Sequence, residues 1–502
     1  MNWVNLWTHR PYSPFVMQLV TRATVDAKRF PKLFPASRIT VGGNYWLERT
    51  QNYFYEKSEI DATVDALAEK TVRDPSFLYV FLKTCYDRSL SLNDFAGRAV
   101  ARDLNDEPSE ALVGRIDGFV SLFEDMYEYA TALPLLGYRH DNPLTSRMNA
   151  LLIGKAGAIG EAAKFGDYLL VLNRPVKRLQ TQDQELAVLK LASRAAKEGI
   201  KERGELQRVF GSEIERIREK YSWLSFDFCD TIAWNVDYYA SLVAEKTLLA
   251  PEAIAEEIES NERYEERAAA EFDEAARKLR LSESEKAVFE VVRDVGYYKW
   301  AREQVFQQAT LRMKRVQDEL GARTGMPSTL ESKYLVSSEW SGALKNAGEF
   351  VDKAKLRTKN CLMLVTRSGT TIVEGAAAEN DYSKMVFVEE DVNAVVKELR
   401  GMPACAGVAR GRVSVVNVFS EARKMKQGDV LVSVATTPDL VPAMKRASAI
   451  VTSEGGVTCH AAIVSRELGI PCVVGVRNVH KILRDGDEVE VDATAGIIKI
   501  IK

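Results

Sequence analysis

The sequence predicts a multidomain protein with a mostly α-helical N-terminal region followed by an α/β domain. Residues 1–330 look largely helical, and between Val288 and Leu320 apolar residues recur at steps of three, four or seven, which is the spacing of one helix face. Residues 401–502 instead alternate short β-branched runs with helical segments. A chain of 502 residues is long enough for several domains.

Helix-start signals mark the N-terminal region. Ser282 and Glu285 form a capping box before a long apolar stripe, so we expect one helix over 283–320, ended by Gly321. Thr181 and Gln184 form a second box of this kind. Pro251 suits the first position of a charge-rich helix that reaches about residue 280. Such long apolar stripes need neighbouring helices, and a helical bundle follows.

Residues 331–400 are expected to form a small α/β connecting module. Residues 361–365 and 370–373 have the composition of strands, and the turn residues between them predict a hairpin. Residues 391–399 favour a helix. The charged segment before Gly401 then gives way to Gly-Met-Pro, which is typical of a linker, so we expect a hinge near Gly401 to Pro403.

The last domain, 401–502, is expected to bury its own core beneath a sheet. Its candidate strands and helices alternate along the chain. The strands are expected at 413–416, 430–434, 449–451, 489–491 and 497–501, and the helices at about 439–446 and 459–468.

One histidine in this domain occupies a position that favours an anion. A strand-like run is followed by the turn glycines Gly455 and Gly456, and then by a helix with Thr458 as its expected N-cap. His460 therefore lies in the first helical turn, where free N–H groups and the positive dipole end attract anions. Gly469 and the proline after it are expected to end this helix.

His460 also has two simpler interpretations. A single histidine at a helix start is most often a surface or capping residue. The adjacent Cys459 raises the question of a metal, but neighbouring residues rarely reach one ion together, and no CxxC or HxxxH spacing supports a zinc site. No metal site is predicted.

The complete sequence motif around His460 decides between these interpretations. Residues 452–475 resemble the phosphohistidine ("mobile" or swivelling) domain of the phosphoenolpyruvate (PEP)-utilising enzymes, a family that includes PEP synthase, pyruvate phosphate dikinase and rifampicin phosphotransferase. Residues 437–444 resemble the family segment T-P-D-x-x-P-x-M. The resemblance implies an α/β swivelling phosphohistidine domain at 401–502.

The resemblance also implies roles for individual residues. His460 would be the catalytic phosphoryl carrier, and Gly455, Gly456, Thr458 and Cys459 would bind the phosphoryl group. Thr437 and Arg466 are possible supporting residues. Two alternatives stay open: Thr458 can serve simply as the N-cap, and Arg466 can pair with a neighbouring acid.

In this family the histidine takes the β-phosphate of ATP, with release of AMP and inorganic phosphate, and swings to a second site. The sequence has no G-x-x-x-x-G-K-[ST] motif, and the helical region 1–330 lacks the features of an ATP-grasp domain. We therefore expect ATP, with Mg²⁺, to be bound by a separate ATP-grasp partner. The chain ends at Lys502, so no PEP-binding barrel is expected to follow.

The expected function is that of a subunit of a split, dikinase-type phosphotransferase, similar to PEP synthase or rifampicin phosphotransferase, with a small-molecule acceptor. The helical region would bind this acceptor, dock the ATP-grasp subunit, or do both. The alternative is a phosphocarrier or regulatory protein that passes phosphate from His460 to a partner protein.

Composition limits the partners and the cellular compartment that the sequence suggests. The net charge of −3 and the isoelectric point of about 6.1 give no electrostatic case for nucleic acid. The six cysteines show no disulfide framework. No signal peptide is recognisable at the first residues, and no apolar run is long enough to span a membrane. We therefore expect a cytoplasmic protein.

Overall fold

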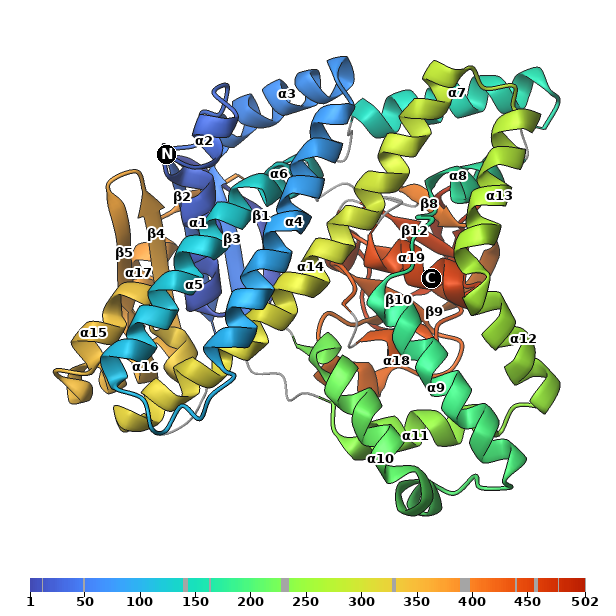
Figure 1. The fold of residues 1–502 in the computed structure, drawn as a ribbon. Helices are drawn as coiled ribbons and strands as arrows, with labels where there is room; N and C mark the ends of the chain where they lie inside the picture. Colours follow the sequence, from blue (N-terminus) through green and yellow to red (C-terminus); the bar gives the residue numbers. More distant parts are fainter. Residues whose placement is uncertain are drawn as a thin grey trace.

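The computed structural model describes residues 1–10, 12–47, 50–138, 143–161, 164–226, 234–326, 331–388, 398–437, 440–455, 459–476 and 478–501. Two sheets lie on either side of the long helix α14 (Glu283–Arg323), which crosses the molecule between them (Figure 1). The chain is thus multidomain, with a largely helical N-terminal region and an α/β domain at the C-terminus, as predicted.

A six-stranded sheet, formed by described residues, was not expected in the N-terminal region. Its strand order is β5-β4-β2-β3-β1-β6. The strands are β1 (Asn2–Arg10), β2 (Val41–Leu47), β3 (Thr50–Glu56), β4 (Asn360–Thr366), β5 (Gly369–Glu374) and β6 (Val386–Phe387). The predicted hairpin is present as β4 and β5, but β4 pairs along its length with β2. The hairpin therefore extends the N-terminal sheet instead of founding a separate module at 331–400.

Helices cover both faces of this sheet. Eleven of the twelve residues of α1 (Pro14–Val25) are buried against one face, and α17 (Gly375–Ser383) packs on β4. On the α17 face, Tyr382 stacks on Tyr45 with ring centroids 3.9 Å apart. The other helices of this half are α2 (Phe30–Leu33), α3 (Lys57–Arg73), α4 (Ser76–Ala99), α5 (Ser109–Ala130), α6 (Ala132–Tyr138), α15 (Trp340–Ala343) and α16 (Ala347–Lys359).

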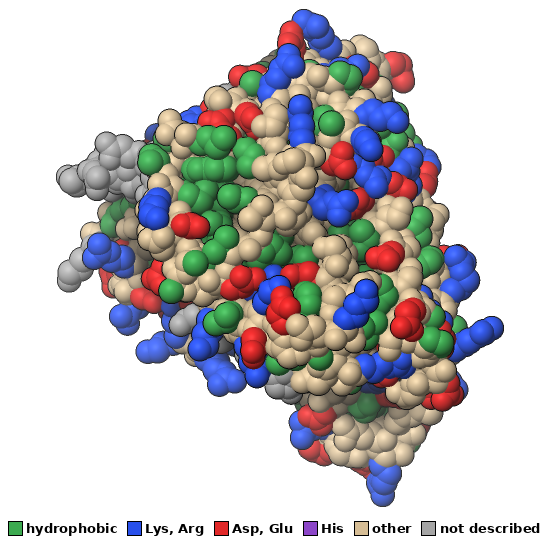
Figure 2. All heavy atoms as spheres, turned by 90° about the vertical axis from the view of Figure 1, so that its left-hand side faces the viewer, with side chains coloured by type: hydrophobic (Ala, Val, Ile, Leu, Met, Phe, Trp, Pro, Cys, Tyr) green, Lys and Arg blue, Asp and Glu red, His purple; other side chains and the backbone are tan. Residues whose placement is uncertain are grey.

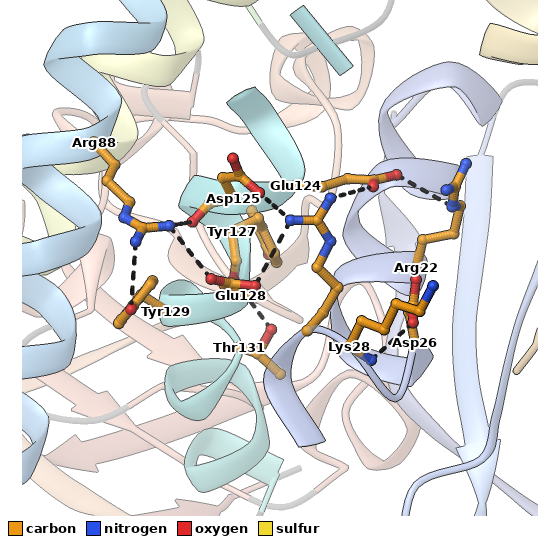
Figure 3. A network of polar contacts seen from close by, with 11 residues as sticks. Arg22, Asp26, Lys28, Arg88, Glu124, Asp125, Tyr127, Glu128, Tyr129 and Thr131 are labelled. Atoms are coloured by element: carbon orange, nitrogen blue, oxygen red, sulfur yellow. Dashed lines mark hydrogen bonds and ion pairs between the residues drawn. The ribbon is translucent and has the colours of Figure 1, made fainter. Parts of the chain in front are cut away.

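A network of ion pairs joins α1, α4 and α5 (Figure 3). Arg22 and Arg29 contact the buried carboxylate of Glu124 at 3.1 and 3.2 Å. Glu128, one turn further along α5, pairs with Arg88 at 3.3 Å. Burial raises the pKa of Glu124 and of Glu128, and the neighbouring arginines counteract this rise.

A second group of helices lies in the half of the molecule that holds the C-terminal sheet (Figure 1). They are α7 (Pro143–Ala158), α8 (Phe165–Asn173), α9 (Gln180–Lys197), α10 (Arg203–Tyr221), α11 (Val236–Thr247), α12 (Pro251–Glu262) and α13 (Tyr264–Lys278). Two predictions for these helices were wrong: where α9 begins, and that one unbroken helix follows Pro251. Helix α9 begins at Gln180, because the side chain of Gln182 caps the N–H of Leu179. The helix starting at Pro251 breaks at Arg263, whose ψ of 9° leaves the helical range.

The capping box predicted for the long helix is confirmed. Ser282 Oγ accepts from the N–H of Glu285, and the Glu285 carboxylate accepts from the N–H of Ser282. The helix runs through Gly321 to Arg323, so Gly321 does not end it. A Cβ on Gly321 would lie 3.1 Å from that of Ser332, which indicates that this glycine serves close packing.

The C-terminal sheet has the order β7-β14-β13-β9-β10-β11-β12-β8 in the described residues. The strands are β7 (Glu398–Arg400), β8 (Met402–Cys405), β9 (Val408–Val415), β10 (Val430–Ser433), β11 (Ala449–Thr452), β12 (Cys472–Val474), β13 (Glu488–Asp492) and β14 (Ile497–Ile500). The strands predicted from sequence are all present. The central strands β9 to β12 are parallel, and the flanking strands are antiparallel.

Three helices pack on this sheet: α18 (Val441–Met444), α19 (His460–Leu468) and α20 (Val479–Ile482). The expected hinge residues belong to the sheet itself. Gly401 donates its N–H to the carbonyl of Gly496 at 2.9 Å, and Met402 begins β8. Glu398 and Leu399 lie in β7, and residues 391–397 of the helix expected at 391–399 fall outside the described residues. The C-terminal sheet thus includes Glu398, which precedes the domain boundary predicted at residue 401.

The side of the molecule seen at the left of Figure 1 carries basic and acidic side chains interspersed, with apolar side chains gathered in one area (Figure 2). Charge on this face is therefore mixed in sign. None of the helices in the described ranges combines the length and the apolar character needed to cross a bilayer.

Candidate functional site

Two loops meet at the carboxyl ends of the parallel strands β10 and β11. Their last residues, Ser433 and Thr452, are in register. Past the strands the backbones stay joined, because the N–H groups of Ser453 and Glu454 donate to the carbonyls of Ser433 and Val434 at 2.9 and 2.8 Å. Ligands of parallel α/β sheets bind at this edge, so the loops are the expected place for a site.

Helix α19 starts directly beyond the second loop and places His460 at its first position. The N-cap is Cys459, not the predicted Thr458: its Sγ accepts from the N–H of Ala462 at 3.4 Å. Gly469 ends the helix with a φ of +65°, as predicted. Thr458 and Gly456 lie outside the described residues.

The imidazole of His460 is held by the other loop. Thr436 Oγ1 lies 2.8 Å from Nδ1 of His460. Because a hydroxyl can donate or accept, it suits either state of Nδ1. The predicted supporting residue was its neighbour Thr437, whose carbonyl accepts from the N–H of Leu440. Thr436 follows strand β10 at the ligand-binding edge, and that position is the signal that sequence reasoning overlooked.

Gly455 lies against the N-cap of α19. Its φ is +109°, and a Cβ there would come within 2.7 Å of the Cys459 sulfur. Only glycine allows both this conformation and this approach. Burial raises the pKa of the Cys459 thiol, so this side chain is neutral at physiological pH and caps the helix without adding negative charge.

Arg466 faces away from His460, towards strand β8. Its Nε donates to the carbonyl of Ala404 at 3.2 Å, and burial lowers the pKa of its guanidinium. This backbone contact ties α19 to the edge strand. In the second loop, Ser453 Oγ lies 2.5 Å from Nδ1 of His480 on α20, which anchors the loop from below.

Helix α14 of the N-terminal region borders the histidine. The rings of Trp300 and His460 have centroids 6.1 Å apart and planes inclined at 60°. The Nζ of Lys299 lies 5.3 Å from the Trp300 ring centroid. Nothing in the sequence pairs Trp300 with His460.

Within the described residues, no group of three or more His, Cys, Asp and Glu side chains is arranged to hold a metal ion. The described groups that meet at this edge of the sheet are the His460 imidazole, the Thr436 hydroxyl and the backbone N–H groups at the start of α19. Such a set suits a group carried covalently on the histidine.

Comparison with known proteins agrees with this geometry. Residues 425–496 match the family model described as PEP-utilising enzyme, mobile domain. A probable phosphoenolpyruvate synthase of Methanothermobacter thermautotrophicus is 46% identical over 27% of this chain and 18% of its own length. The phosphoenolpyruvate synthase of Pyrococcus furiosus is 50% identical over 26% of this chain and 15% of its own length. A probable phosphoenolpyruvate synthase of Pyrococcus horikoshii is 56% identical over 22% of this chain and 13% of its own length.

The matches cover less than a quarter of these curated relatives' length. Among solved structures, Thermococcus kodakaraensis aconitase X aligns with 21% of this chain at 22% identity and a TM-score of 0.18, which carries no argument. The resemblance expected from the sequence is thus confirmed for the C-terminal domain: residues 425–496, with His460 among them, form a mobile domain of the PEP-utilising enzyme family.

Proposed function

We propose that this chain is the phosphoryl-carrying component of a PEP synthase-like phosphotransferase, with His460 as the carrier. The observation that carries the proposal is the placement of His460 at the start of α19, with Nδ1 against Thr436, inside a PEP-utilising mobile domain. A neutral imidazole is a competent nucleophile toward phosphorus.

The contact with Thr436 assigns different tasks to the two ring nitrogens. When the proton is on Nδ1, this nitrogen donates to the hydroxyl, and the lone pair of Nε2 can attack phosphorus. As the Nε2–P bond forms, the bond to the leaving oxygen breaks and its electron pair departs with that oxygen. The ring then carries positive charge and can release its Nδ1 proton, after which the Thr436 hydroxyl can reverse and donate.

The start of α19 suits the product. The first-turn N–H groups and the positive end of the helix dipole stabilise negative charge, each such interaction contributing about 0.3–1 kcal/mol when exposed. The neutral Cys459 thiol adds no repulsion. Gly456 and Thr458 remain predicted phosphoryl contacts, since they lie outside the described residues.

For the donor and the acceptor, the proposal follows the resemblance. ATP with Mg²⁺ would be bound by a separate ATP-grasp partner, and His460 would take its β-phosphoryl group and pass it to a small molecule. The contact between His460 and Trp300 favours delivery to a site on this chain's own helical region. This observation argues for a split phosphotransferase over a phosphocarrier that serves another protein.

The test uses the full chain, a candidate ATP-grasp protein and ATP labelled at the β-phosphate. The proposal predicts label on the chain that is acid-labile and base-stable, with formation of AMP. His460→Ala should take up no label, whereas His140→Ala, which changes a histidine outside residues 401–502, should keep it. Equal labelling of the His460→Ala variant would refute the proposal.

A further inference from the structure

Lys299 and Trp300, adjacent on α14, lie opposite the start of α19. The Trp300 ring meets the His460 ring edge-on, and the Lys299 ammonium lies over the same Trp300 ring. Burial raises the pKa of Cys459, while the N–H groups of Ala462 and Ala461 and the charges of Lys299 and Arg466 act to lower it. Lys299 is therefore close enough to α19 for its charge to act on the residue beside His460.

We propose that Lys299 and Trp300 form the station at which phosphorylated His460 docks, with Lys299 as the cation that contacts the phosphoryl group. This inference rests on the proposed function of His460 and adds the residues that receive the loaded carrier. The ligand class is a phosphoryl dianion held on an imidazole nitrogen.

Charge supports this assignment. The first turn of α19 has no acidic or basic side chain other than His460. Arg466, the basic residue of its last turn, is engaged with Ala404. Phosphorylation would add two negative charges beside His460, and a cation on the facing helix can balance part of this charge. Lys299 on α14 supplies it, and an ammonium is a suitable point charge for phosphate.

The tryptophan contributes a different effect. A large apolar ring against the imidazole keeps water from one side of it, and the P–N bond of a phosphohistidine is sensitive to hydrolysis. The ring also holds the ammonium by a cation–π contact at 5.3 Å. Lys299 would thus balance the charge of the phosphoryl group, and Trp300 would keep water from the P–N bond.

Further contacts show that the C-terminal domain is seated on the helical region in this conformation. Gly166 of α8 lies in van der Waals reach of Ala406, since a Cβ built on it would be 3.8 Å from that of Ala406. Lys445 and Glu245 form an ion pair at 4.0 Å across the same boundary. A docked arrangement is what a receiving station requires.

The test uses the full chain and potassium phosphoramidate, a small donor that needs no partner protein. Nε2 of His460 attacks phosphorus, the P–N bond of phosphoramidate breaks, and ammonia leaves with the electron pair and takes up the proton that the ring releases. Phosphohistidine is followed by ³¹P NMR and intact mass. The variants are Lys299→Met, Lys299→Arg and, as the matched control on the same helix, Lys286→Met, whose side chain pairs with Asp273 instead.

We expect Lys299→Met to slow the formation of phospho-His460 by about tenfold or more, the effect of removing one contact to a charged group. Lys299→Arg should restore most of the rate, and Lys286→Met should match the wild type. Trp300→Ala should shorten the lifetime of phospho-His460, whereas Trp300→Phe should largely keep it. Circular dichroism checks that each variant is folded.

The outcomes separate the two proposals. If wild type forms phospho-His460 and Lys299→Met forms and loses it at the same rates, the station is refuted and the carrier role stands. If Lys299→Met is slowed and Lys299→Arg is not restored, charge is not the cause and the phosphoryl contact is refuted. If wild type and His460→Ala take up phosphate equally, the carrier role itself fails.

Discussion

Thr436 Oγ1 lies 2.8 Å from Nδ1 of His460, although the two residues are 24 positions apart in the chain. They meet because β10 and β11 are parallel neighbours whose carboxyl ends lie at the same sheet edge. This contact fixes the orientation of the imidazole, because Nδ1 is engaged in a hydrogen bond within the protein. The phosphoryl group is then left for Nε2.

The first prediction concerns this contact. Thr436→Val keeps the shape of the side chain and removes its hydroxyl, so Nδ1 loses a hydrogen-bond partner. We expect the phosphorylation rate of His460 to fall by about tenfold, the order of one hydrogen bond. Thr436→Ser should behave nearly as wild type. The initial rate of labelling by phosphoramidate measures both, and an unchanged rate in Thr436→Val would show that the hydroxyl does not position the ring.

The second prediction concerns Gly455. A Cβ at this φ of +109° is strained and would overlap the Cys459 sulfur, so Gly455→Ala should displace the N-cap and with it His460. We expect strongly reduced labelling with little change in circular dichroism. Gly428→Ala is the matched control, since Gly428 also has a positive φ but no neighbour within 4 Å of a built Cβ. Equal labelling of the two variants would contradict the role of Gly455.

The C-terminal domain was largely predictable, because its information is local. Short β-branched runs alternate with a helix whose ends are marked by a cap and Gly469, and the structure shows the same elements. The N-cap prediction was wrong by one residue, since the sulfur of Cys459 serves where the hydroxyl of Thr458 was expected.

The N-terminal sheet could not be predicted in the same way. β2 pairs with β4, and Trp46 lies opposite Cys361, more than 300 residues away along the chain. No local signal reports such a pairing. Two aromatic residues near the N-terminus, Trp3 and Tyr45, lie in the core on one face of this sheet. The contact of Trp300 with His460 was hidden for the same reason.

The third prediction concerns a buried arginine that joins α16 to the sheet. Arg357 is 2% exposed and contacts the carboxylates of Glu339 and Glu374 at 2.6 and 2.7 Å. Arg357→Met would leave two carboxylates without their cation, and we expect a loss of about 3–5 kcal/mol in the free energy of unfolding. Lys353→Met, which removes a surface pair with Glu349, should cost at most about 1 kcal/mol. Urea denaturation compares them, and equal losses would contradict the assignment.

The fourth prediction concerns the network of Figure 3. Burial raises the pKa of Glu124 above its ordinary value of 4.5. At pH values just above 4.5, Glu124 keeps its proton in the folded chain but loses it in the unfolded chain. The contribution of Glu124 to folding stability therefore falls as pH rises through this range. Glu124→Gln lacks this titration.

The expected result is that Glu124→Gln gains stability relative to wild type between about pH 5 and about pH 7. Urea denaturation of both proteins at the two pH values measures the difference. If Glu124→Gln instead loses stability relative to wild type over this pH interval, the ion pairs with Arg22 and Arg29 outweigh burial, and the pKa of Glu124 is lowered.

The most direct test of the central claim is to locate the phosphoryl group on the chain after reaction with phosphoramidate. The phosphorylated protein is examined by mass spectrometry of its peptides and by ¹⁵N NMR of its histidine rings, at alkaline pH where the P–N bond persists. The account predicts a single phosphohistidine, at Nε2 of His460, and none in His460→Ala. A phosphoryl group on another residue, or on Nδ1 of His460, would contradict it.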